Sequence, residues 1–160
     1  MEDTLDIASI AAGVNAINLD AVMGSAVKRE GLPADRAPAA VETYRQFLTL
    51  VAAYPKMAIC VPSDADKIWH QHILATGQYA KDCTALCGRS IHHDPTAFGT
   101  PEFHAAWAET AKLYKDHFGV DLDSDPTALD RTPLSAATCY RPADPQDDLP
   151  DELPPMISAH

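Results

Sequence analysis

Basic residues are scarce in this chain of 160 residues. Only 12 Lys and Arg stand against 23 Asp and Glu, which gives a formal net charge of −11. A surface of this charge repels a phosphate backbone or an anionic membrane unless basic side chains gather in a local patch, and the sequence contains no such patch. Nucleic acids and membranes are therefore excluded as expected partners. We expect a small-molecule substrate or a protein partner instead.

Long hydrophobic runs and cysteines are also few. No apolar segment approaches the length that spans a bilayer, and the first residues, Met1 to Asp6, are acidic where a signal peptide would be basic. Four cysteines are too few for a disulfide framework in a chain of this length. We therefore expect a cytoplasmic protein with free thiols. The cysteines are Cys60, Cys83, Cys87 and Cys139.

The motifs of several common enzyme classes are missing as well. The sequence has no phosphate-binding loop, no dinucleotide fingerprint and no serine-nucleophile elbow, so it does not reveal a substrate class. The chain is nevertheless 46% hydrophobic, and its length suits one globular domain that needs neither a metal nor a disulfide to hold it together.

Proline and glycine divide most of the chain into segments with helical periodicity, which predicts an all-α fold, a compact bundle of about five helices. In residues 35–54, apolar side chains recur every three or four positions, so this helix should be central to the core. The apolar run 57–61 lies between two prolines and is too short for a helix, which predicts an extended buried connector. The predicted helices cover residues 4–12, 19–30, 35–54, 63–87 and 101–118.

The end of the chain has a different composition. Residues 120–160 hold seven of the thirteen prolines and nearly all of their charged side chains are acidic. A segment of this kind has no core of its own. We therefore expect a helical domain over residues 1–120 and an acidic, proline-rich tail over residues 121–160. The tail either wraps over the domain or is disordered until it meets a partner.

Histidines are concentrated around the fourth predicted helix. Neutral imidazole is the commonest metal ligand and titrates near neutral pH, so such a cluster is a candidate site. In a continuous helix, His70 and His72 point in different directions and cannot bind one ion from one face. Their partners should come from the segment after Gly88, which is short enough to fold back against the helix. The clustered histidines are His70, His72, His92 and His93.

These residues predict a metal site. His72 would be the central ligand, joined by His70 or by His92 and His93. Zinc or iron suits such imidazole-rich coordination. Asp66, one turn before His70, would orient that imidazole, and Tyr79 could supply a proton or a hydrogen bond to substrate. The predicted function is that of a metal-dependent enzyme acting on a small molecule.

Three other interpretations remain open. The same histidines could serve a metal-free acid–base enzyme. Cys83 and Cys87 could join His92 and His93 in a zinc site of the Cys-x3-Cys-x4-His-His type. In the third interpretation, His72 and its aromatic neighbours only complete the core, and the tail recruits a protein partner, which would make the chain a non-catalytic interaction module.

The segment from Pro62 to Pro95 resembles the glycine-rich domain-containing protein-like family. The resemblance rests on Trp-His-x-His, then Tyr-x-x-Asp-Cys, then His-His-Asp-Pro, in this order. It implies a common site rather than a particular reaction. The glycine-rich extension for which that family is named is absent, and Cys87 stands where an apolar residue is expected. The equivalents of the family's site residues would be His70, His72, Tyr79 and Cys83.

Overall fold

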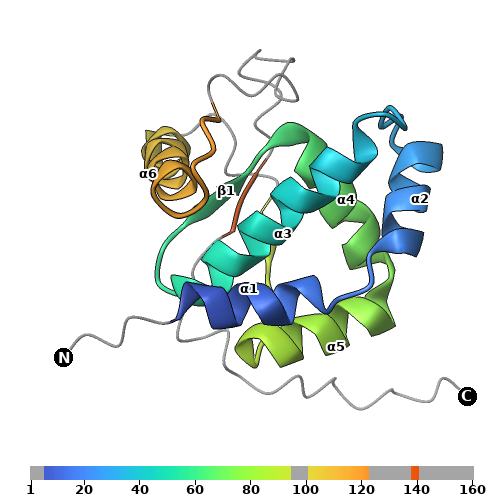
Figure 1. Cartoon of the computed structure of the whole chain (residues 1–160), viewed down its shortest axis with the longest axis horizontal. Coiled ribbons are helices and arrows are strands. Elements are labelled where there is room, and N and C mark those ends of the chain that lie inside the picture. Colours follow the sequence, from blue (N-terminus) through green and yellow to red (C-terminus); the bar gives the residue numbers. More distant parts are fainter. Residues whose placement is uncertain (1–5, 95–100, 123–137, 141–160) are drawn as a thin grey trace, which may run out of the picture.

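Six helices account for most of the residues that the computed structural model describes, which are 6–94, 101–122 and 138–140. The all-α prediction is confirmed, with six helices where about five were expected, and three short strands accompany them (Figure 1). The helices are α1 (Ile7–Asn15), α2 (Asp20–Arg29), α3 (Ala37–Ala53), α4 (Ser63–Leu74), α5 (Thr76–Cys87) and α6 (Pro101–Phe118). The strands are β1 (Ile59–Val61), β2 (His93–Asp94) and β3 (Thr138–Tyr140).

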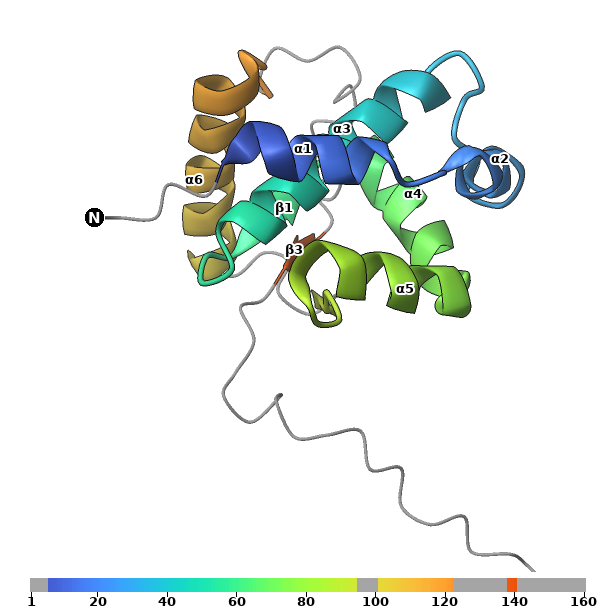
Figure 2. The same cartoon turned by 60° about the horizontal axis from the view of Figure 1, so that its bottom comes forward.

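Helix α3 forms the centre of the bundle, as its periodicity predicts. It contacts α1, α2, α4, α6 and β1, and Figures 1 and 2 show it between α6 on one side and α2 on the other. Its contacts on several sides explain why nine of its residues are buried, more than a single apolar stripe would require. Tyr44 and Phe47 are the largest of these buried side chains.

The prediction of one helix from Ser63 to Cys87 is wrong. The chain breaks at Ala75, which has φ −80° and ψ 65°, and continues as α5 in a new direction. Helix α5 lies beside α1 at the bottom of Figure 1. No proline stands at the break, so the sequence carries no strong signal for it. The turn brings α5 back toward α4, and distances along a straight helix therefore do not apply to this segment.

Some of the helix ends that the sequence predicts are found in the structure, and others are not. Gly88 closes α5 in the left-handed conformation, at φ 71°, as expected for a C-terminal glycine. In the sequence, Ser63 followed by Asp66 resembles a capping box. This prediction is wrong, because Ser63 is already the first residue of α4 and Pro62 precedes it without a side-chain cap. Thr100, which the sequence predicts as the N-cap of the helix over residues 101–118, lies outside the described residues.

A small sheet joins distant parts of the chain. Its order is β1-β3-β2, and β3 is antiparallel to both neighbours. Strand β1 corresponds to the predicted connector, and β3 comes from the predicted tail, whose division from the domain stays a prediction. The prediction of free thiols is wrong for Cys60, which is disulfide-bonded and lies opposite Cys139 in the register, whereas Cys83 and Cys87 are free. Sequence spacing gives no sign of this strand pairing.

Within the described ranges, no single helix is long and apolar enough to cross a membrane. The pair α1 and α2, bent by 71° at the break between them, passes the same test of length and composition.

Gly88→Ala should lower the free energy of unfolding by about 1 to 2 kcal/mol, because an L side chain is strained in the left-handed conformation even though no atom would meet the new Cβ within 4 Å. Urea denaturation followed by circular dichroism measures the change. Gly24→Ala is the matched control, since Gly24 lies inside α2 with equally open space. That variant should instead gain roughly 0.5 to 1 kcal/mol from lower chain entropy in the unfolded state. Equal effects in the two variants would contradict this account.

Candidate functional site

Asp66, His70 and His93 meet where the first turns of α4 face strand β2. Asp66 and His70 lie one helical turn apart on α4, and Asp66 Oδ2 is 3.0 Å from His70 Nε2. His93 comes from β2, and its Nε2 lies 3.1 Å from Asp66 Oδ1 and 3.1 Å from His70 Nε2. One carboxylate and two imidazoles therefore direct their ligand atoms toward one another. This is the only group of three or more potential metal ligands in the described parts of the chain.

The Asp66 carboxylate carries a negative charge in a nearly dry position. The residue is only 3% exposed, and a buried carboxylate is costly unless a positive group or a metal compensates it. Burial by itself would raise the pKa of Asp66, but hydrogen bonds and charges from His70 and His93 outweigh it, so the pKa lies below the ordinary 3.8. The position in the first turn of α4 also favours a negative charge. The site is thus built around an ionised carboxylate.

His70 is held on both sides by carboxylates. Its Nε2 faces Asp66, and its Nδ1 lies 3.4 Å from Glu30 Oε1. The hydrogen bond to Asp66 is the main reason that the pKa of His70 lies above its ordinary 6.5, against the opposing effect of partial burial, and Glu30 adds to the rise. Without a metal, a proton on Nε2 therefore takes the place that a cation could fill.

A partly buried tyrosine holds the segment that carries His93. The Tyr79 hydroxyl donates a hydrogen bond to the carbonyl oxygen of Ile91, two residues before His93, and accepts one from Trp69 Nε1 at 3.0 Å. The Trp69 ring also packs against the His93 ring, with centroids 4.4 Å apart. Burial raises the pKa of Tyr79 well above its ordinary range. The catalytic role predicted for Tyr79 stays a prediction, and the structure assigns its hydroxyl two protein partners.

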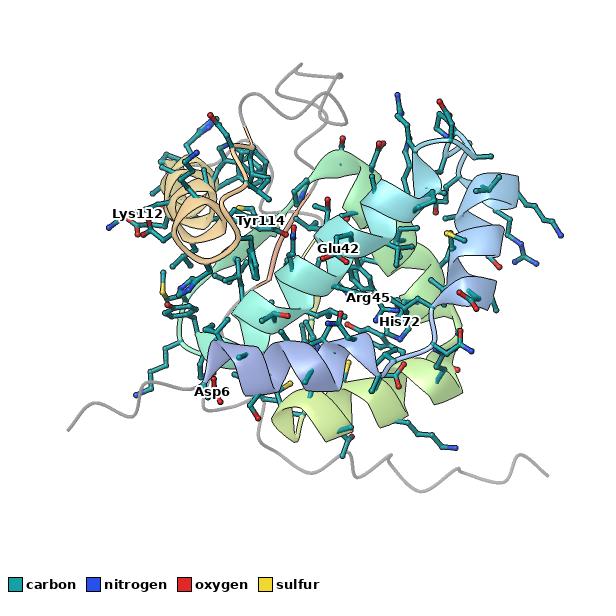
Figure 3. All side chains as sticks on the ribbon, in the orientation of Figure 1. Asp6, Glu42, Arg45, His72, Lys112 and Tyr114 are labelled. Carbon is teal, nitrogen blue, oxygen red and sulfur yellow. The ribbon has the colours of Figure 1, made fainter. Side chains whose placement is uncertain are left out.

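His72 belongs to a different network in the interior (Figure 3). Its Nε2 lies 2.8 Å from Asp82 Oδ2 and its Nδ1 lies 2.7 Å from the Tyr44 hydroxyl. Because a carboxylate only accepts, Nε2 donates to Asp82, and Nδ1 then accepts from Tyr44. Both ring nitrogens are occupied, so His72 has no lone pair directed at the other histidines. Burial lowers the pKa of His72 below 6.5 despite the Asp82 carboxylate.

The remaining predicted ligands lie outside the cluster. His92 is exposed, next to His93 in sequence but not part of the three-residue group. Cys83 is buried, and burial raises the pKa of its thiol. The Cys87 Sγ lies 3.4 Å from the carbonyl oxygens of Cys83 and Arg89. Neither cysteine joins a ligand group in the part of the chain that the structure describes.

The sequence predicts only some of the residues in these two networks. Asp66 was expected only to orient His70, although its spacing of four from His70 is the spacing of paired ligands on one helix face. That signal was available. Glu30, Tyr44 and Asp82 had no signal, because they reach the histidines from other helices: Tyr44 lies 28 residues before His72 in the sequence.

His72→Ala should lower the free energy of unfolding by about 3 to 5 kcal/mol, because it opens a cavity and removes a partner from both Tyr44 and Asp82. Urea denaturation followed by circular dichroism tests this. His92→Ala is the matched control, because this exposed side chain should contribute less than about 0.5 kcal/mol. Equal stability of the two variants would exclude the structural role of His72.

In metal-free protein, His70 should titrate above pH 6.5, because the Asp66 carboxylate favours its charged form. His72 should titrate below pH 6.5, because burial disfavours its charged form. NMR of the imidazole protons resolves both midpoints. Asp66→Asn should lower the His70 midpoint and leave that of His72 in place. Equal midpoints for the two histidines in the wild type would contradict the structure.

The two histidines also affect stability in opposite senses. The contribution of His70 is present below pH 6.5 and is lost as the pH rises through its raised pKa, because the folded state binds the proton more tightly. The contribution of His72 is present above pH 6.5 and is lost as the pH falls through its lowered pKa.

Comparison with known proteins identifies a family. A family model described as UCP032817-like matches residues 21–112, and this range includes Asp66, His70 and His93. No curated protein and no solved structure matches the chain. The resemblance to the glycine-rich domain-containing protein-like family is wrong, because the model that matches is a different one and nothing supports a glycine-rich family. That resemblance rested on about a fifth of the chain, whereas the match spans more than half of it. The chain therefore belongs to the UCP032817-like family.

Proposed function

We propose that this protein binds a divalent transition metal through Asp66, His70 and His93 and uses it to act on a small molecule. The observation that carries the proposal is the convergence of the three ligand atoms, with Nε2 of each histidine 3.0 to 3.1 Å from an oxygen of the same carboxylate. Two imidazoles and one carboxylate are a common ligand set of catalytic zinc sites and of non-haem iron sites.

The spacing of the ligand atoms fits such an ion. A tetrahedral zinc ion with bonds of 2.0 to 2.1 Å separates its ligand atoms by about 3.3 Å. The two Nε2 atoms lie 3.1 Å apart, so small side-chain shifts are enough to admit the ion. Asp66 can bind through either oxygen, because each one already faces a different imidazole. A metal binds the unprotonated imidazole nitrogen, so binding would release any proton held there.

Zinc is the first candidate and iron the second. Sites of nitrogen and oxygen ligands bind zinc more tightly than ferrous iron, according to the usual order of divalent metals. Three protein ligands leave the fourth position of a tetrahedral ion for water or substrate, and zinc brings the pKa of a bound water to about 7. Water activation at neutral pH is therefore the chemistry that we propose for this site.

The role of the protein would be to hold these groups in place before the metal arrives. Asp66 and His70 are fixed at one-turn spacing on α4. His93 is fixed through the hydrogen bond of Tyr79 to Ile91 and through its ring contact with Trp69. Ligands that are already oriented lose less conformational entropy when a metal binds. His72 would support this arrangement from the core without binding the metal.

Zinc affinity tests the proposal. We expect the wild-type protein, freed of metal by a chelator, to bind one zinc ion in isothermal titration calorimetry. His93→Ala should weaken binding by more than about 100-fold, because loss of a ligand exceeds the roughly 10- to 100-fold effect of an outer partner. Elemental analysis of the purified wild type shows which metal it carries.

His92→Ala is the matched control, since it removes the neighbouring exposed imidazole and should leave the affinity unchanged. Circular dichroism confirms that both variants are folded. Absence of zinc and iron binding in the wild type, or equal affinities in the His92 and His93 variants, would overturn the proposal. The first result would favour the non-catalytic interaction module.

A further inference from the structure

Glu30 lies on the side of His70 that faces away from the ligand group. It is the C-cap residue of α2, directly before Gly31. Its Oε1 lies 3.4 Å from His70 Nδ1, whereas His70 Nε2 faces Asp66 and His93. In this arrangement the Glu30 carboxylate contacts the ring nitrogen that a metal would not use. It is therefore poorly placed to be a fourth ligand of the same ion.

A second residue of α4 holds the Glu30 carboxylate. Gln71 Nε2 donates a hydrogen bond of 3.1 Å to the same Oε1 atom, and Gln71 is only 6% exposed. The Glu30 side chain keeps 26% of its surface exposed. One oxygen of Glu30 thus contacts both His70 and Gln71, which are adjacent on α4, and the hydrogen bond from Gln71 fixes the carboxylate relative to the imidazole.

The position of Glu30 affects which ring nitrogen of neutral His70 carries the proton. A neutral imidazole has one N–H and one lone pair, and the hydrogen bond made by one nitrogen decides which form it takes. When a metal takes the place of the proton on Nε2, a carboxylate at Nδ1 favours the remaining proton on Nδ1 and leaves the lone pair of Nε2 for the metal. Carboxylates in this position orient metal-bound histidines and make them more basic.

His72 differs from His70 in the partner of its second ring nitrogen. His72 also contacts a carboxylate, that of Asp82, but its second nitrogen is hydrogen-bonded to Tyr44. The carboxylate of Asp82 therefore completes a closed network in the core. The carboxylate of Glu30 instead leaves the second nitrogen of His70 in the group of potential ligands.

We propose that Glu30 is a positioning residue, which holds His70 in the form and orientation that bind the metal through Nε2. The inference rests on the proposed metal site and adds α2 to the elements that build it. It also gives the contact between α2 and α4 a functional consequence, because displacement of Glu30 would weaken metal binding without removing any ligand.

Zinc titration of metal-free wild-type, Glu30→Gln and Glu30→Ala proteins tests this role. Zinc affinity should fall by about 10- to 100-fold in Glu30→Ala. The loss should be smaller in Glu30→Gln, because the amide oxygen can still accept the proton from Nδ1. Glu42→Gln is the matched control, since it removes one negative charge from an exposed position on α3. Its affinity should stay within about 2-fold of the wild type, because a distant exposed charge is screened.

A second measurement separates positioning from a purely structural effect. Nitrogen-15 NMR of the His70 ring in the zinc-bound wild type should show the proton on Nδ1, and Glu30→Ala should shift this Nδ1 resonance while unfolding in urea stays cooperative. If Glu30→Ala binds zinc as tightly as Glu42→Gln does, the role of Glu30 is overturned and the metal site stands. If the wild type binds no zinc or iron, the metal site itself fails, and this inference fails with it.

Discussion

The hydrogen bonds of His72 are the interaction on which the rest of this structure depends. They join the buried Tyr44 of α3 and His72 of α4 to Asp82 of α5, whose side chain is partly exposed. The contact between His72 and Asp82 requires α5 to fold back on α4, which a continuous helix would prevent. The fold-back in turn places Tyr79 where its hydroxyl reaches Ile91 and holds the segment that carries His93. A buried polar network of this kind is stable only when every member has a partner.

Two histidines two positions apart therefore serve different purposes. The side chains of His70 and His72 leave α4 in different directions, one toward Glu30 and Asp66 and the other toward Tyr44 and Asp82. Their pKa values move in opposite directions for the same reason, since one imidazole is half-exposed beside carboxylates and the other is desolvated. The proposed metal chemistry belongs to the first environment, and the stability of the core belongs to the second.

The proposed site is arranged around the negative charge of Asp66. A buried carboxylate has to be balanced, and without a metal the hydrogen bonds and charges of His70 and His93 stabilise it. A divalent cation would satisfy the same carboxylate more completely and release any proton held on the imidazole nitrogens that bind it. Glu30 would keep the proton of neutral His70 on Nδ1 while the metal binds at Nε2. In the proposed site, protons and a metal would thus compete for the same positions.

Sequence alone predicts the all-α class, the central position of α3, the end of a helix at Gly88 and the segment in which the histidines gather, because helical periodicity and left-handed glycines are local properties. It also placed Asp66 one turn from His70. Three features arise from tertiary contacts instead: α4 and α5 separate, His93 rather than His92 joins the ligand group, and His72 stays in the core. These outcomes depend on contacts such as Tyr44 with His72 and Glu30 with His70, which link residues 28 and 40 positions apart. No local pattern encodes such contacts.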